Sequence, residues 1–308
     1  ELGGVHTLED FKAQRSSYVD PISVTYGGLE VVEMPPNNQG VVALMLLKMM
    51  EQLAPLAEDP LSVERFHVML EAGRLAYMVR DAFVADPEMA DVPVTHMLDD
   101  KTIAELVGRI DRNRRMPDLG PVPQPVGTDT TYFAVVDQNG MGVSFINSLF
   151  KGFGSGIVSR EAGVVLQNRG QGFVVQPGHP NCVAPRKRPL HTLVPGLVLK
   201  DGALDKVFGV MGGSYQPAGH AHVLSNIIDY GMDIQEAIDC PRAFYDAGKV
   251  MAEESVPAAV RDGLEALGHE VGIPQFPWGG SQIIEVDRQQ GVLVGASDPR
   301  KDGCAFGF

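Results

Sequence analysis

The order of predicted elements assigns this chain to the α+β class, with stacked layers of sheet and helix. Two observations lead to this prediction. Helical patterns dominate the part before residue 117, whereas the part after residue 127 begins with a block of strands. Helical patterns then return between residues 221 and 267, and two strands close the chain. Strand blocks and helix blocks arranged in this way bury their apolar faces by packing against one another in layers.

The part before residue 117 is predicted to contain one strand, Leu29–Glu33, and three helices. The segment "VVALMLLKMMEQL" (Val41–Leu53) follows the turn "MPPNNQG" and is apolar on nearly all sides, which predicts a buried helix. A longer helix is predicted for Leu61–Phe83, with Ser62 as its N-cap. The third and more polar helix is predicted for Asp99–Asn113.

The second half of the chain begins after a segment rich in proline and glycine, Pro117–Gly127, which predicts an exposed linker. The runs Thr130–Val136 and Gly142–Ile146 flank the turn residues Asn139 and Gly140, a strong signal for a β-hairpin. Further strands are predicted for Ala162–Asn168, Leu193–Gly202, Lys206–Gly213, Ser281–Asp287 and Gly291–Ser297. Further helices are predicted for Ala221–Gly231, Ile234–Cys240 and Val256–Leu267, the last capped by Gly268.

The composition is that of an ordinary globular protein with an acidic surface. The 308 residues are 44% hydrophobic and 21% charged, with a formal net charge of -14. An acidic protein is not expected to bind nucleic acid or an anionic membrane, and no apolar run is long enough to span a membrane. The cysteines Cys182, Cys240 and Cys304 form no disulfide framework. These free thiols, with no leader visible in the sequence, favour a cytoplasmic location, with a periplasmic or secreted one as the alternative.

Two threonines at the mouth of the predicted hairpin raise the first chemical question. A hydroxyl is a weak nucleophile at neutral pH and needs a base nearby. If the chain is cut just before Thr130, the new α-amine of that residue can serve as the base. By itself the pattern is a weak signal and favours two ordinary strand residues, because threonine is common in strands.

A second candidate feature is the pair Gly212–Gly213 in "VMGGSYQPAGH", at a predicted strand end. Backbone N–H groups at such a position are free to donate, and glycine lets a reacting carbonyl approach closely. This is how an oxyanion hole is built, although a Gly-Gly pair alone can also be a simple turn.

Six motifs give the chain a resemblance to the γ-glutamyltransferase (γ-glutamyltranspeptidase) family. They are "TTYFAVVDQNGMGVSF", "GFGSGIVSREAGVVLQN", "PRKRPLHTLVPGLVLKDG", "GVMGGSYQPAGH", "IDYGMDIQEAIDCPR" and "GASDPRKDGCAFGF". The resemblance covers nearly the whole chain and implies an N-terminal-nucleophile hydrolase with a four-layer αββα sandwich. It also implies a precursor that cuts itself, so that residues 1–129 are the mostly helical C-terminal part of a large subunit and residues 130–308 are the small subunit.

The resemblance assigns the catalytic roles by position. Thr130 matches the nucleophile, which places the cut between Asp129 and Thr130. Ser148 matches a threonine that bonds the region of the nucleophile's amine, and Gly212 and Gly213 match the oxyanion hole. The expected reaction is cleavage of a γ-glutamyl or related small-molecule amide, such as glutathione, through an acyl-enzyme, with no metal and no organic cofactor.

The positions that bind the acyl donor depart from the family pattern. Gly172 stands where the family has an acidic residue that holds the donor's α-amino group. Arg169 replaces a glutamine, Phe150 replaces an asparagine, and His191-Thr192 replaces a pair of serines. Arg169 favours an anionic acyl group. These changes resemble the acylase-like branch, which includes cephalosporin and glutaryl acylases.

The resemblance also implies a partner, because the family's large subunit has a further stretch before the segment "GGVHTLEDF". An unprocessed, inactive relative is the alternative of a different class, and assembly into a homo-oligomer stays open. Replacing Phe150 by Asn and Gly172 by Asp together is expected to raise turnover of γ-glutamyl donors.

Two other patterns have ordinary interpretations. His220 and His222 form an HxH pair, but they lie at the start of a predicted helix, where side chains two residues apart do not face each other. Trp278 lies before a Gly-Gly turn and is expected to pack rather than to line the site.

Overall fold

The computed structural model describes residues 3–119 and 129–308. Most of the predicted linker Pro117–Gly127 therefore lies outside the described residues. The mixture of helices and strands confirms the α+β class. No helix in the described part is long and apolar enough to cross a membrane.

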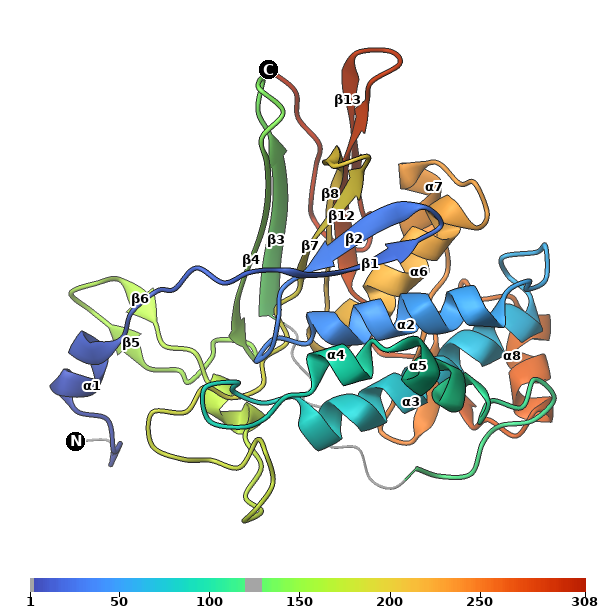
Figure 1. The fold of residues 1–308 in the computed structure, drawn as a ribbon. Helices are drawn as coiled ribbons and strands as arrows, with labels where there is room; N and C mark the ends of the chain where they lie inside the picture. Colours follow the sequence, from blue (N-terminus) through green and yellow to red (C-terminus); the bar gives the residue numbers. More distant parts are fainter. Residues whose placement is uncertain (1–2, 120–128) are drawn as a thin grey trace.

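The centre of the molecule is a six-stranded antiparallel sheet (Figure 1). Its strands lie in the order β1 (Ile22–Tyr26), β2 (Leu29–Glu33), β7 (Pro195–Lys200), β8 (Ala203–Met211), β12 (Gly280–Asp287) and β13 (Val292–Ser297). Strand β1 pairs with β2, and β2 pairs with β7 from the second half of the chain, so the predicted subunit segments 1–129 and 130–308 share one sheet.

Helices cover one face of this sheet. They are α2 (Gly40–Leu53), α3 (Val63–Phe83), α4 (Val94–Met97), α5 (Asp100–Val107), α6 (Gln216–Ile228), α7 (Ile234–Asp239) and α8 (Ala258–Ala266). The main core lies between the two layers, where Val198 and Phe208 of the sheet belong to the same buried cluster as Leu44 and Leu224 of the helices. Burying these side chains is the main stabilising term of the fold.

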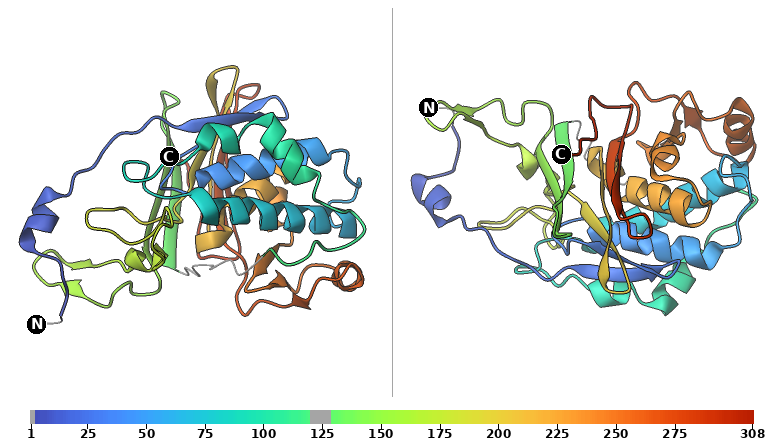
Figure 2. Two further views of the ribbon diagram at one scale, coloured as in Figure 1. Left: turned by 60° about the horizontal axis from the view of Figure 1, so that its bottom comes forward. Right: turned by 90° about the horizontal axis from the view of Figure 1, so that it is seen from above.

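The opposite face of the sheet carries the hairpin of β3 (Asp129–Val136) and β4 (Gly142–Phe150). Figure 2 (right) shows the hairpin, the six-stranded sheet and the helices as successive layers. The described residues therefore form three layers. The fourth layer of the expected αββα sandwich, helices on the outer side of the hairpin, is not found in residues 3–119 and 129–308.

Smaller elements lie at the margins of these layers. They are α1 (Leu8–Ala13), β5 (Val158–Ser159) with β6 (Val164–Val165), the 3-10 turns η1 (Arg169–Gly172) and η2 (Gly213–Tyr215), and the small sheet of β9 (Ala243–Asp246), β10 (Lys249–Ala252) and β11 (Val271–Gly272).

Most predicted elements are confirmed, and the largest differences in their bounds are three. The third helix ends at Val107 rather than Asn113, because Gly108 caps it. The strand predicted for Ala162–Asn168 is reduced to Val164–Val165 before the chain turns at η1. Helix α6 begins at Gln216, five residues before the predicted start, because Pro217 suits the first turn of a helix.

Candidate active site

Thr130 is the second residue of β3 and pairs with Ser148 of β4. Residues paired directly across an antiparallel ladder have Cα atoms about 5 Å apart, so the two hydroxyl-bearing side chains are neighbours. The Ser148 hydroxyl also accepts a hydrogen bond from the Phe150 N–H (2.9 Å). The ladder register shifts between Asp129 and Thr130, which is the bond predicted to be cut. An irregular ladder holds that peptide less firmly than a regular strand would.

The packing of the hairpin on β8 shows which end of the sheet faces Thr130. The Ser144 hydroxyl donates to the carbonyl of Phe208 (3.2 Å), and the Tyr132 ring lies directly over Gly209, where an added Cβ would come within 2.3 Å of it. Ser144 is paired with Ala134, and Tyr132 lies two residues closer to Thr130 on β3. Their contacts on β8, Phe208 and then Gly209, move in the same direction toward the C-terminal end of β8. Thr130 therefore lies toward the end of β8, where the Gly-Gly pair follows.

Gly212 and Gly213 form the turn between β8 and α6, with φ angles of 126° and 61°. Both angles lie in the region that favours glycine. A Cβ on Gly212 would come within 3.0 Å of the Gly279 Cα atom, so the backbone is closely packed from below. The turn leads through η2 directly into α6, so it lies at the N-terminal, positive end of a helix dipole.

Gln39, which the sequence patterns did not single out, connects this turn to Thr192, one of the positions assigned to the acyl-donor site. Its amide nitrogen donates to the carbonyl oxygens of Thr192 (3.1 Å) and Gly213 (3.0 Å). Its amide oxygen accepts from Arg80 (3.0 Å), and its side chain is fully buried. The motif "MPPNNQG" was available as a signal, but only the tertiary structure reveals which backbone groups Gln39 holds.

Arg169 is buried beside Thr192 and Phe150. Its Nη1 atom donates to the Thr192 hydroxyl (3.2 Å), its Nε atom donates to the Gln167 amide oxygen (3.2 Å), and its guanidinium carbon lies 5.1 Å from the centre of the Phe150 ring. Burial lowers the pKa of Arg169 to about 10. The structure thus brings together Arg169, Thr192 and Phe150, three positions that the sequence analysis assigned to the donor site.

Phe150 and Gly172 are constrained in ways that bear on the expected double replacement. Phe150 is buried, pairs with Asp129 and has a φ of 83°, a conformation uncommon for a bulky residue. A Cβ at Gly172 would lie 2.6 Å from the carbonyl oxygen of Leu190. An aspartate at position 172 therefore needs the backbone at residue 190 to move, which counts against the expected gain in turnover of γ-glutamyl donors.

His191 lies beside this group and is uncharged. Burial, followed by the charges of Arg169 and Arg188, lowers the pKa of His191 to about 4. Its Nδ1 atom accepts from the Leu193 N–H (3.4 Å), which leaves Nε2 as the protonated nitrogen. At neutral pH His191 is therefore a hydrogen-bond donor and not a cation.

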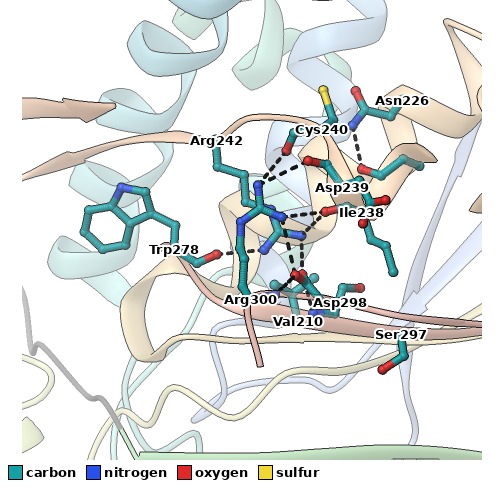
Figure 3. A network of polar contacts seen from close by, with 12 residues as sticks. Val210, Asn226, Ile238, Asp239, Cys240, Arg242, Trp278, Ser297, Asp298 and Arg300 are labelled. Carbon is teal, nitrogen blue, oxygen red and sulfur yellow. Dashed lines mark hydrogen bonds and ion pairs between the residues drawn. The ribbon is translucent and has the colours of Figure 1, made fainter. Parts of the chain in front are cut away.

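A buried ion network joins Arg242, Asp298 and Arg300 (Figure 3). Arg242 pairs with Asp298 (2.7 Å) and also donates to the carbonyl of Trp278 (2.7 Å), the residue before Gly279. Arg300 contacts the second carboxylate oxygen of Asp298 (3.3 Å). The motif "GASDPRKDG" thus has a structural role, which is to fix residues 278–280 against the Gly-Gly turn.

The structure shows the contacts of Trp278 and His220, two of the residues given ordinary interpretations. Trp278 packs on Tyr215 (ring centres 5.7 Å apart) and on Phe244 (5.1 Å). His220 pairs with Glu33 (2.7 Å), and no group of three or more metal-binding side chains is found in the described part of the chain. A cavity of about 780 Å³ lies in the helical layer, and none of the predicted site residues lines it.

Comparisons with known proteins bear on the whole chain. The sequence model of the Gamma-glutamyltranspeptidase family matches residues 1–308. The chain is 36% identical to the glutathione hydrolase-like YwrD proenzyme of Bacillus subtilis, over 99% of this chain and 59% of the relative. It is 34% identical to the oxamate amidohydrolase proenzyme of Klebsiella pneumoniae, over 100% of this chain and 59% of the relative. The chain thus spans under two thirds of the length of these relatives.

Solved structures agree with this result. The cephalosporin acylase from Bacillus halodurans matches with a TM-score of 0.89 and 36% identity, over 98% of this chain and 55% of that one. A gamma-glutamyltranspeptidase chain from Pseudomonas nitroreducens matches with a TM-score of 0.54 and 28% identity, over 58% of this chain and 99% of that one.

Proposed function

The chain belongs to the gamma-glutamyltranspeptidase family, and on this premise we propose that it is the nucleophile-bearing part of an amide hydrolase that cuts itself before Thr130. Residues 1–129 are then the C-terminal part of the large subunit, and residues 130–308 are the small subunit. The latter segment makes up 58% of the chain, the same share that the Pseudomonas nitroreducens chain matches with almost its whole length.

The observation that carries this proposal is the position of Thr130. The residue stands beside Ser148, at the end of the hairpin that faces the Gly212–Gly213 turn, and the ladder is irregular at the bond before it. A nucleophile, a neighbouring hydroxyl and a source of backbone N–H donors thus converge at one end of two packed sheets. This is the arrangement that acyl transfer requires.

Self-cleavage is proposed to begin with attack of the Thr130 hydroxyl oxygen on the carbonyl carbon of Asp129. The C–N bond breaks, the acyl group moves to the Thr130 oxygen as an ester, and the nitrogen becomes a free α-amine. Water then hydrolyses the ester and releases residues 1–129 with a C-terminal carboxylate. The Thr130 hydroxyl and amine are now both available.

Turnover repeats the same chemistry on a substrate amide. The α-amine of Thr130 takes the proton of its own hydroxyl, the oxygen attacks the substrate carbonyl, and the N–H groups of Gly212 and Gly213 stabilise the negative charge that forms on the carbonyl oxygen. The leaving amine departs with a proton. Water, or a second amine, then takes the acyl group from Thr130.

The acyl donor is proposed to be either a γ-glutamyl amide, such as glutathione, or a non-glutamyl amide of the acylase type. Two observations favour the second donor. No carboxylate side chain fits at Gly172 without backbone movement, and Arg169 is a cation where the family binds an ammonium group. Relatives named for oxamate and cephalosporin substrates support this choice.

The apolar outer face of the hairpin is evidence for a further part of the large subunit that covers it. Phe133, Val135, Val143 and Phe145 are all exposed, and the two phenylalanine rings stack with centres 4.6 Å apart. An apolar face of this kind is normally covered. We propose that the part of the large subunit not included in this chain adds strands and helices there, which completes the αββα sandwich.

The intact mass of the denatured, full-length protein tests the proposed function. Two species that divide between Asp129 and Thr130 are expected, Thr130→Ala should give one species with no amide hydrolysis, and Thr130→Ser should still divide. Turnover by a correctly folded Thr130→Ala variant would contradict the nucleophile assignment. A single species from the wild-type protein would favour the unprocessed, inactive alternative.

A further inference from the structure

The helical layer holds a cavity that the proposed reaction does not use. Its volume is about 780 Å³, which lies within the range of sites that take small molecules. The walls come mainly from α3, α6 and the strand β9, with a contribution from α2. None of the described residues assigned to the nucleophile, the oxyanion turn or the acyl donor lines this cavity. It is therefore a separate space from the candidate active site.

Small residues keep this cavity open. Gly73 lines it from the middle of α3, where glycine makes a helix less stable than alanine does. A Cβ added to Gly73 would meet no atom of the described residues within 4 Å, so close packing does not explain the glycine. Ala218 and Ala221 line the cavity from α6. The chain thus keeps room in the helical layer at some cost in helix stability.

His222 supplies a polar point in the cavity wall. The residue is only 5% exposed, and its Nε2 atom is buried without a hydrogen-bond partner among the described residues. Burial lowers the pKa of His222 well below its ordinary value of 6.5, so the ring is neutral. A buried polar atom without a partner is costly, which points to a ligand group that would satisfy it. A hydroxyl group suits a neutral imidazole nitrogen in either tautomer, because it both donates and accepts.

The charges in the cavity wall are balanced within the protein. Each charged side chain that lines the cavity has a partner of opposite charge: Arg74 with Glu71, Arg115 with Asp118, and Glu270 with Lys249. A charged ligand would find no free counter-charge among these residues and would lose its hydration. The cavity therefore suits an uncharged molecule.

Aromatic side chains make up much of the apolar lining. They are Phe66, Tyr77, Tyr215, Phe244 and Tyr245. Phe244 makes edge-to-face contacts with Tyr77 (ring centres 5.6 Å apart) and Tyr215 (5.4 Å), so the rings present both faces and edges. Aromatic pairs of this kind favour a planar aromatic ligand over a flexible aliphatic one.

We propose that this cavity is a second binding site, which takes an uncharged aromatic molecule whose hydroxyl group bonds the Nε2 atom of His222. The site adjoins the oxyanion turn, because Tyr215 belongs to η2 and the Tyr77 hydroxyl donates to the carbonyl of Ser214. An occupant in contact with these two tyrosines changes the position of the turn and hence kcat. This effect on kcat rests on the proposed function, whereas binding does not.

The first test is a fluorescence titration of the full-length, processed protein at pH 7 with three naphthalene compounds. 2-Naphthol carries the hydroxyl group, naphthalene lacks it, and 2-naphthoate carries a charge. 2-Naphthol should bind about 10-fold more tightly than either of the others, the effect of one hydrogen bond to a buried group. Absence of 2-naphthol binding, or tighter binding of 2-naphthoate, would overturn the proposal.

Variants assign the binding to this cavity. His222→Leu should abolish the preference for 2-naphthol over naphthalene without lowering Tm, because it removes an unsatisfied buried atom. Gly73→Phe should weaken binding of both compounds at least about 10-fold by filling the room above the glycine. Gly73→Ala is the matched control, since it makes the same helix more stable and leaves the cavity open. Wild-type binding of 2-naphthol by both His222→Leu and Gly73→Phe would place the molecule elsewhere and overturn the proposal.

Kinetics with an amide substrate separates this inference from the proposed function. Saturating 2-naphthol should change kcat at least about 2-fold in wild-type protein and leave kcat of Gly73→Phe unchanged. An increase in KM alone would mean competition at Thr130 and would overturn the second site. If no amide is hydrolysed but binding depends on His222 and Gly73, the site stands and the proposed function fails. If amides are hydrolysed and 2-naphthol does not bind, the site is wrong and the proposed function stands.

Discussion

Asp298→Asn is expected to destabilise the protein strongly, because Asp298 is the acceptor at the centre of a buried network. Its Oδ2 atom accepts hydrogen bonds from the Arg242 guanidinium (2.7 Å) and the Ser281 backbone N–H (2.9 Å). Its Oδ1 atom accepts one from the Arg300 backbone N–H (2.9 Å). The side chains of Asp298 and Arg242 are fully buried (Figure 3). An asparagine keeps the shape and one acceptor oxygen, but it turns an N–H donor toward another donor and removes the counter-charge of Arg242.

The size of the effect follows from the loss of a buried ion pair. Removing one partner of such a pair costs about 3–5 kcal/mol, and the retained oxygen places this variant at the lower end, about 3 kcal/mol. The entropy of unfolding is roughly 2 cal/mol/K per residue, which over the 308 residues gives roughly 0.6 kcal/mol/K. Asp298→Asn should therefore lower Tm by about 5 °C.

The pH dependence gives a second readout of the same pair. Burial acts to raise the pKa of Asp298, but Arg242, Arg300 and two backbone N–H groups outweigh it and hold the pKa below the ordinary value of 3.8. A carboxyl group with a lowered pKa stabilises the folded state above its unfolded value and loses that contribution as pH falls through the folded value. The difference in Tm between wild type and Asp298→Asn should be constant between about pH 5 and pH 8 and should shrink below about pH 4.

Differential scanning calorimetry with Asp302→Asn as the control measures both effects. Asp302 is exposed and lies in the same terminal segment, so its replacement should change Tm by less than about 1 °C. An equal Tm for the two variants would refute the reasoning, because it would mean that the network contributes no net stability. A slower self-cleavage in Asp298→Asn is also expected, since the network supports the segment under the Gly-Gly turn.

The buried histidines, the Gln39 bridge and the donor positions lead to three further predictions. Burial lowers the pKa of His191 to about 4 and that of His269 to about 3, so both are neutral in the folded protein and protonate near pH 6.5 in the unfolded chain. The free energy of unfolding should therefore fall between pH 6.5 and pH 4 by about 3 kcal/mol per histidine. A urea midpoint that stays constant over this range would contradict the prediction. Gln39→Ala should lower kcat by about 10–100-fold with a smaller change in KM, as expected for a misplaced oxyanion turn; an unaltered kcat would mean that the bridge is not needed. Phe150→Asn should still fold, since asparagine accepts its φ of 83°, but it should lose about 2–4 kcal/mol of stability because a buried ring is replaced by a smaller polar side chain. Adding Gly172→Asp should lower stability by about 1–3 kcal/mol more in thermal unfolding, and a Tm equal to that of Phe150→Asn would show that the backbone at residue 190 yields freely.

Local patterns predicted the elements whose sequence signal is strong. Ser62 caps α3 by accepting from the Arg65 N–H, as its position before an apolar periodic run indicated. The turn at Asn139–Gly140 joins β3 and β4, and Gly140 has a φ of 80°, a conformation that suits few other residues. Strand β1 was missed, since its alternation is short and its pairing partner, β2, is what stabilises it.

Some residues of the candidate site could likewise be found from sequence patterns, whereas another was revealed only by the tertiary structure. The identity of Thr130, Ser148, Gly212 and Gly213 could be proposed from motifs, because the chemistry demands those residue types at those positions. Gln39 could not, although it stands in the motif "MPPNNQG", because its role depends on two carbonyl groups 153 and 174 residues away in the sequence.

The sequence by itself determined the class of fold, the family and the departures at the donor positions, because each is a matter of residue type and order along the chain. The tertiary structure decided what those departures mean. Only the packing reveals that Gly172 faces a backbone carbonyl with no room for a side chain, and that Arg169 is buried without a carboxylate. The physical reason is that steric space and the cost of an unpaired charge depend on neighbours distant in the sequence, which no local pattern contains.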